Sequence, residues 1–196
     1  MVVRMVFDPN GALARIPAEQ RLNVFALVIY IPDPLGRFLD DLRKDLVPGC
    51  NPHAHVSVLP PRPLSVELPL AANQVHDCAA SWTPFDLTLG EIQVFPVTNV
   101  IYLELAHGAG EMYRMHGAMN ARALEFNEPF AYHPHITVAQ ELAPADVAAA
   151  AQRARELWAG YTGPRTFRAE RTAFVQNTLL NCWIDLAEYS LGAVTV

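Results

Sequence analysis

The chain has 196 residues, of which 52% are apolar and 17% charged, and its net charge is −6. It is long enough to bury a substantial core, and no run approaches the roughly 18 consecutive apolar residues of a membrane span. The acidic balance argues against binding to extended duplex nucleic acid, which usually requires a basic stripe. Cys50, Cys78 and Cys182 are widely spaced and form no C-x-x-C pair, which favours neither a disulfide framework nor a structural zinc site.

The first residues show neither a periodic pattern nor a secretory one. Residues 1–21 are expected to form an N-terminal extension, followed by a single domain over residues 22–196. The apolar run at the start is too short for a secretory signal and lacks a clear small-residue cleavage site. We therefore expect a cytoplasmic monomer without a membrane segment.

Strands and an amphipathic helix alternate in the first half of this domain. Leu22 to Ile31 is a nearly continuous apolar run, which predicts a buried strand. Asp33-Pro34 predicts a helix start, because Asp is a good N-cap and proline is tolerated at the first helical position, and Pro48-Gly49 ends the helix. A strand from His53 to Leu59, closed by Pro60-Pro61, is expected next.

The rest of the chain follows the same kinds of pattern. Ala71 to Trp82 predicts a helix, and the alternating segments Phe85 to Phe95 and Val97 to Leu105 predict antiparallel strands. His107 to Leu124 carries methionines at helical spacing, as expected of core packing. The last predicted elements are a strand around His133 to Ala139, a helix from Pro144 to Trp158, and strands over Phe167 to Val175 and Leu180 to Leu186.

These elements occur twice in the same order: strand, helix, His strand, helix, strand. The first copy covers about residues 22–96 and the second about residues 97–188, with His55 and His135 at equivalent places. Strands joined by short turns and mixed with helices predict an α+β fold with antiparallel sheets. Two such lobes facing each other would bring both His strands to a central cleft.

Each His strand pairs a histidine with a hydroxyl two residues later. Alternate side chains of an extended chain share a face, so His55 lies with Ser57, and His135 with Thr137, opposite the apolar spacers. A further histidine precedes each motif by two residues. The three histidines outside the motifs are expected at the surface or in helix caps: His76, His107 and His116.

Two imidazoles across a cleft supply the acid and the base for in-line attack at phosphorus, because one can accept a proton while the other donates one. Ser57 and Thr137 are placed to donate hydrogen bonds to the non-bridging oxygens, and the scheme needs no metal or cofactor. Tyr132 and Tyr102 are candidates for stacking on a base, and Arg62 is a candidate for steering a phosphate.

The segments His55-Val56-Ser57-Val58-Leu59-Pro60-Pro61 and His133-Pro134-His135-Ile136-Thr137 resemble the two-histidine (2H) phosphoesterase superfamily, in its 2′-5′ RNA ligase and cyclic phosphodiesterase branch. The resemblance in element order runs from about Leu22 to about Leu186. It implies a bilobal fold of two pseudo-twofold-related lobes of antiparallel sheet, with helices outside.

The resemblance also implies a function and the residues that perform it. Superfamily members hydrolyse 2′,3′-cyclic or 2′-5′-type phosphodiesters of nucleotides or RNA ends without a metal. His55 and His135 match the catalytic pair, and Ser57 and Thr137 match the hydroxyls that contact phosphate. Ser57 stands where threonine is commoner, and it keeps the hydrogen-bond donor.

Two other functions stay open at this point. A metalloenzyme could bind zinc or iron through two His-x-His pairs, although neither motif contains an acidic or cysteine ligand. The four histidines concerned are His53, His55, His133 and His135. A non-catalytic nucleotide- or RNA-binding module could keep the cleft without turnover, although binding alone requires no acid–base pair.

Overall fold

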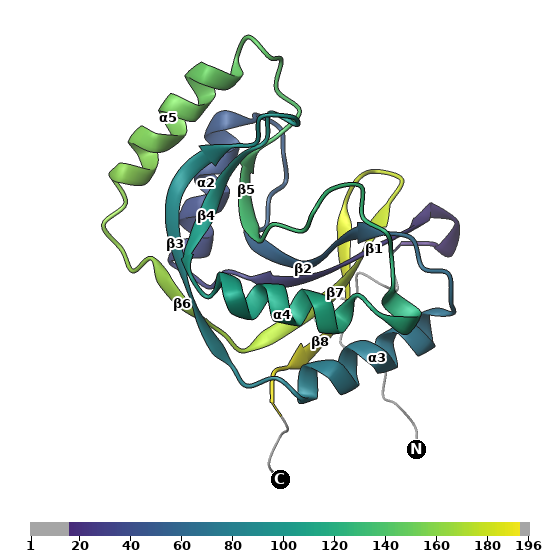
Figure 1. The fold of residues 1–196 in the computed structure, drawn as a ribbon. Coiled ribbons are helices and arrows are strands. Elements are labelled where there is room, and N and C mark those ends of the chain that lie inside the picture. The colour runs from purple at the N-terminus through teal and green to yellow at the C-terminus, as the bar shows by residue number, and fades with distance from the viewer. Residues whose placement is uncertain (1–15, 193–196) are drawn as a thin grey trace.

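Two four-stranded antiparallel sheets frame the computed structural model, which describes residues 16–192 (Figure 1). The first sheet has the order β2-β1-β7-β8 and consists of β1 (Arg21–Tyr30), β2 (His55–Arg62), β7 (Arg171–Thr178) and β8 (Trp183–Ser190). The second has the order β5-β4-β3-β6 and consists of β3 (Phe85–Val94), β4 (Ile101–His107), β5 (His135–Ala139) and β6 (Thr166–Ala169). The expected bilobal α+β architecture is confirmed.

Two of the four helices pack against a strand of the sheet to which their own neighbouring strands do not belong. The helices are α2 (Leu35–Leu46), α3 (Leu68–Ala80), α4 (Ala109–Met119) and α5 (Val147–Ala159), with 3-10 turns η1 (Ala18–Gln20) and η2 (Arg122–Leu124). Helix α3 packs on β7 and β8, and α5 packs on β3. Helix α2, which follows β1, contacts β5, whereas α4, which follows β4, contacts β2. Each motif strand is thus supported by a helix that belongs to the other lobe.

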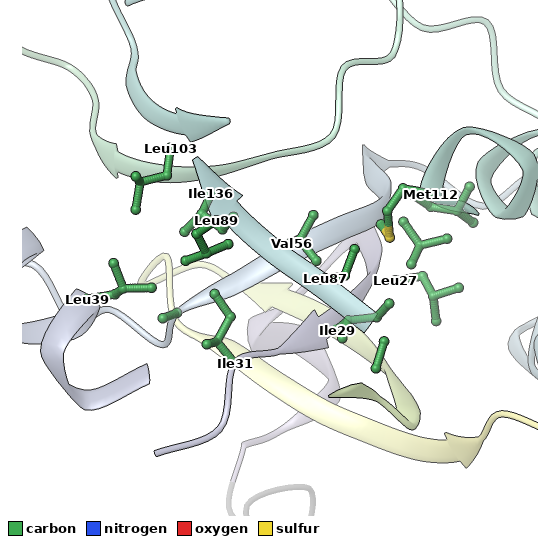
Figure 2. Packing of buried hydrophobic residues seen from close by; sticks show 14 of the residues in the cluster. Leu27, Ile29, Ile31, Leu39, Val56, Leu87, Leu89, Leu103, Met112 and Ile136 are labelled. Atoms are coloured by element: carbon green, nitrogen blue, oxygen red, sulfur yellow. The ribbon is translucent and has the colours of Figure 1, made fainter. Parts of the chain in front are cut away.

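One hydrophobic core joins both sheets and all four helices. Figure 2 shows Leu27 and Val56 of the first sheet together with Leu87 and Ile136 of the second. The three methionines of α4 have no exposed surface, which confirms the predicted core stripe: Met112, Met115 and Met119. Because the core is continuous, the two lobes hold each other in place.

The start of α2 differs slightly from the prediction. The helix begins at Leu35, so Pro34 precedes it, and Oδ1 of Asp33 accepts a hydrogen bond from the backbone N–H of Arg37 at 3.0 Å. Gly36 allows the helix to lie close to the end of β1, since a Cβ there would stand 2.1 Å from the carbonyl oxygen of Ile31. This close approach directs α2 toward β5.

Strand β2 does not stop at Pro60-Pro61, as the sequence predicted, but continues to Arg62. It is an edge strand, where prolines are tolerated because one side of the strand has no partner in the sheet. The two prolines lie in an irregularity of the ladder, because Arg62 pairs with Phe25 whereas Leu59 pairs with Leu27.

The prediction of one strand over Phe167 to Val175 was wrong. The segment splits at Glu170 into β6, which pairs with β3, and β7, which pairs with β1. A left-handed backbone at Asn181 (φ 54°) closes the turn before β8, which begins at Trp183 rather than at Leu180. Both sequence halves consequently contribute strands to both sheets.

The expected N-terminal extension lies largely outside the described residues. Within them, Ala18–Gln20 forms a 3-10 turn and Arg21 already belongs to β1. None of the helices in residues 16–192 is long and apolar enough to span a membrane.

Candidate active site

The two motif strands have the same pattern of burial. Residues 51–60 and residues 131–140 pass through buried, half-buried and exposed positions in identical order. Strands β2 and β5 are edge strands of different sheets, and they pack against each other. The motif side chains are half-buried, on the faces turned away from the core: His55 and Ser57 on β2, His135 and Thr137 on β5.

A backbone carbonyl two residues upstream holds each of the two motif imidazoles. Nδ1 of His55 lies 2.7 Å from the carbonyl oxygen of His53, and Nδ1 of His135 lies 2.6 Å from that of His133. A carbonyl oxygen can only accept a hydrogen bond, so Nδ1 carries the proton in both rings. Each Nε2 is left with a lone pair for proton transfer.

Burial lowers the pKa of both imidazoles, because it disfavours the charged form. The pKa of His55 falls to about 4, mainly through burial and further through the positive charges of Arg43, His53 and His135, against its hydrogen bond to His53. The pKa of His135 is also lowered, again mainly by burial, with a smaller effect of His133. The electrostatic effect of His135 on His55 shows that the motifs act on each other.

The hydroxyl groups of Ser57 and Thr137 are available to a ligand, since neither is hydrogen-bonded to another group of residues 16–192. Their backbone carbonyls are held from the opposite lobe. Oη of Tyr132 donates to the carbonyl oxygen of Ser57 at 2.8 Å, and Nη1 of Arg43 on α2 donates to that of Thr137 at 3.3 Å. The backbone of both residues is therefore held in place beside the histidines.

A family model of the 2′-5′ RNA ligase superfamily matches residues 31–178, a segment that includes both motifs. The chain belongs to this superfamily of 2H phosphoesterases. Its fold is similar to that of E. coli LigT complexed with NADP+, with a TM-score of 0.58, 16% identity, and coverage of 88% of this chain and 98% of that chain. A search among curated proteins gave no significant match.

Two further solved structures show the same fold. TT0787 of Thermus thermophilus has a TM-score of 0.61 and 20% identity, with coverage of 87% of this chain and 99% of that chain. A structure described as a phosphoesterase has a TM-score of 0.55 and 15% identity, with coverage of 88% and 99%. At such identities the likeness concerns the fold alone.

In this 2H phosphoesterase, Tyr132 is engaged inside the protein. Its ring stacks on His116 with centroids 3.8 Å apart and planes 4° apart, and Nδ1 of His116 lies 2.9 Å from the carbonyl oxygen of Val58. Burial, followed by the charge of Glu128, raises the pKa of Tyr132. One face of the predicted base-stacking ring is thus already covered. His116, expected at the surface or in a cap, is half-buried instead.

Arg62 lies in the protein interior, with an exposed fraction of 2%. It forms an ion pair with Glu128, and its Nη1 donates to Oδ1 of Asn120 at 2.7 Å and to the carbonyl oxygen of Leu124 at 3.2 Å. Nε donates to the carbonyl oxygen of Pro60 at 3.0 Å. The prediction that Arg62 steers a phosphate does not fit this position, because its three nitrogens all bond inside the protein.

Tyr102 supports the second motif from the neighbouring strand. Only 8% of it is exposed, and it stacks on Phe95 with centroids 3.9 Å apart and planes 14° apart. The ring of His135 meets this pair at steep angles, 81° to Phe95 and 70° to Tyr102. This position favours support of His135 over the predicted stacking on a base. Phe95 was missed, because it lies at the end of a strand pattern without a motif.

Tyr30 is a further residue that the motifs did not reveal. It is the cross-strand partner of His55, its ring stacks on His53, and its Oη donates to Oδ1 of Asp185 at 2.5 Å. Burial and the hydrogen bond to Asp185 raise its pKa. The β-rich apolar run of β1 signalled its strand, but not its contact with Asp185, which lies 155 residues away.

The geometry of a metal site is not found in residues 16–192, where no three His, Cys, Asp or Glu side chains are placed to hold an ion. All three cysteines are free thiols. Two hollows of about 540 and 660 Å³ lie beside α3 and α4, and no motif residue lines either of them. The candidate site on β2 and β5 is therefore distinct from both of these hollows.

Proposed function

We propose that the protein is a metal-independent phosphodiesterase that hydrolyses 2′,3′-cyclic or 2′-5′-type phosphodiesters of nucleotides or RNA ends. The observation that carries the proposal is the matched pair of imidazoles, each with Nδ1 on a backbone carbonyl and Nε2 free. One Nε2 takes a proton from water, and the other gives a proton to the leaving ribose oxygen. Ser57 and Thr137 donate hydrogen bonds to the non-bridging oxygens as charge develops there.

The charge of the chain and the ligands of a similar protein support a small substrate. E. coli LigT has been solved with NADP+, with 3′-AMP and with ATP, all of them small nucleotides. A net charge of −6 repels a long polyanion, whereas a single phosphodiester needs only the local donors of the motifs. These points support a nucleotide or an RNA end as the substrate.

The test is the separate replacement of each imidazole. His55→Ala and His135→Ala should each lower kcat by about 10²- to 10⁴-fold, because each removes a proton-transfer group. His76→Ala is the matched control, since His76 is exposed and pairs with Asp77 away from the motifs. Circular dichroism verifies folding, and a panel of 2′,3′-cyclic mononucleotides and cyclic-phosphate-terminated oligonucleotides reports turnover and product regiochemistry.

Three results would contradict the proposal. Near-normal hydrolysis by His55→Ala or His135→Ala would show that the two imidazoles are not the acid and the base of the reaction. Stoichiometric bound metal, with activity lost on chelation and restored by metal, would favour a metalloenzyme. Tight binding of a cyclic nucleotide without turnover over hours would favour a binding module.

A further inference from the structure

The histidines that precede the two motifs lie in different ring environments. The ring of His53 stacks face to face on Tyr30, with centroids 3.8 Å apart and planes 12° apart. The ring of His133 instead meets Phe95 at 87° and Tyr102 at 79°, with centroids 5.3 and 5.5 Å away. Two residues that are equivalent in sequence therefore present different surfaces to a ligand.

Tyr30 provides a fixed base for the His53 ring. Its hydroxyl donates a hydrogen bond to Asp185 at 2.5 Å, and its ring packs against apolar side chains of β1 and β7. These side chains form an apolar cluster separate from the main core: Ala26, Val28, Ala173 and Val175. A ring held at its hydroxyl and along its face loses little freedom when a further ring is added to the stack.

The side of the His53 ring that faces away from Tyr30 is open. His53 is an exposed residue, and Tyr30 is the only ring stacked on it in residues 16–192. Its backbone carbonyl holds Nδ1 of His55, so the ring and the candidate catalytic imidazole lie two residues apart on one segment of chain. Residues at i and i+2 of extended chain are about 6.6 Å apart, a span similar to that from a nucleobase to its own phosphate.

We infer that the open face of His53 is the stacking platform for the nucleobase of the substrate. The inference rests on the proposed function and adds an orientation to it: the nucleoside lies on the His55 side of the reacting phosphate. Planar side chains, histidine among them, stack on unpaired bases and tolerate any base, because every base has a π face. His133 lacks the stacked support that Tyr30 gives to His53, since it meets Phe95 and Tyr102 only at steep angles.

The experiment compares a substrate with a base to one without. Wild-type protein and the variants His53→Ala, His53→Phe and His133→Ala are assayed with adenosine 2′,3′-cyclic phosphate and with 1-O-methylribose 2′,3′-cyclic phosphate. The measured quantity is the KM of the baseless compound divided by that of the nucleotide. We expect His53→Ala to reduce this ratio about tenfold, the size of one stacked base. His53→Phe should restore it, and His133→Ala should keep it.

An unchanged ratio in His53→Ala, or an equal loss in His133→Ala, would overturn the inference. If the wild-type protein hydrolyses neither compound, the proposed function fails separately. In that case calorimetric titration of the same variants with 3′-AMP and with ribose 3-phosphate still decides between the two outcomes. A preference for 3′-AMP that depends on His53 supports the platform, and one that does not depend on it refutes the platform.

Discussion

The two motif strands hold their histidines in the same way but are supported by different chemistry. On β2, the carbonyls of Ser57 and Val58 accept hydrogen bonds from Tyr132 and His116. On β5, the carbonyl of Thr137 accepts one from Arg43, a permanent cation. The repeated motif thus supplies two imidazoles, and the residues around them place the two imidazoles in different electrostatic surroundings.

This inequality is what acid–base catalysis requires, since one imidazole must be neutral while the other is charged. The pKa of His55 is lowered further than that of His135, through burial first and the charge of Arg43 next. His55 is therefore the ring that stays neutral in the singly protonated pair. Four measurements test the difference between β2 and β5.

The largest expected effect is the pH dependence of kcat/KM. Both folded-state pKa values lie below the ordinary 6.5, that of His55 at about 4, so the singly protonated pair is most abundant between about pH 4 and the pKa of His135, which lies below 6.5. Above this window kcat/KM should fall about tenfold per pH unit as His135 loses its proton. Initial rates at low substrate concentration, from pH 4 to pH 9, measure the profile.

The variant Arg43→Gln tests whether His55 sets the acid limb of this pH profile. Removing the cation raises the pKa of His55, so the acid limb of the profile should move to higher pH while the basic limb, set by His135, stays in place. Circular dichroism at each pH is the control. A profile centred above pH 7 would contradict the inequality.

The lowered pKa values also predict how stability depends on pH. The histidines bind protons more readily in the unfolded chain than in the folded one, so the free energy of unfolding should decline as the pH drops from about 6.5 toward 4.

The second effect concerns stability on the β2 side alone. Arg62→Ala leaves Glu128, whose side chain is only 10% exposed, without its guanidinium partner and with only His116 at 3.6 Å, which should cost about 3–5 kcal/mol in the free energy of unfolding, measured by urea denaturation. Arg171→Ala is the matched control, because it breaks an exposed ion pair with Glu188 and should change stability by about 0.5 kcal/mol. Similar losses in the two variants would mean that the buried pair is not the main support of β2.

The third effect compares the hydroxyls. Ser57→Ala and Thr137→Ala should each lower kcat by about ten- to hundredfold with little change in KM, because each removes a donor that strengthens in the transition state. Ser57→Thr should retain activity, and Ser65→Ala, an exposed serine beyond β2, should behave as wild type. A rise in KM at constant kcat would instead assign the hydroxyls to ground-state binding.

The smallest effect isolates the support of Ser57. Tyr132→Phe keeps the stack on His116 and loses one hydrogen bond of about 1 kcal/mol, so kcat should fall about fivefold. The same change in a Ser57→Ala background should have little further effect, because Tyr132 acts through that residue. Fully additive losses in this double-mutant cycle would show that Tyr132 works independently of Ser57.

The sequence alone predicted those features of the fold that depend on a local pattern of apolar and polar residues. Alternation fixed the faces of β2 and β5, and helical spacing fixed the buried stripe of α4, because one face of each element meets the core whatever its neighbours are. The superfamily motifs then singled out four residues whose Nε2 atoms or hydroxyls form no hydrogen bond within residues 16–192: His55, Ser57, His135 and Thr137. The helix and strand types, and the antiparallel sheets, were predicted for the same reason.

Contacts between distant segments could not be predicted in this way. An arginine after two prolines is usually a surface residue, and only its pairing with Glu128, 66 residues further on, explains the burial of Arg62. The break at Glu170 is invisible in a continuous alternating pattern, since it depends on which sheet each part joins. Tyr132 and Tyr102 are aromatic in either role, and only the rings beside them show which face is occupied.

The prolines of β2 have a consequence for the behaviour of the protein in concentrated solution. An open sheet edge can recruit a strand from another molecule, which is a common route to aggregation. Pro60 and Pro61 lack the N–H groups that such pairing needs, and they interrupt the ladder at the end of β2. The end of β2 is thus a poor template for a strand of a second chain.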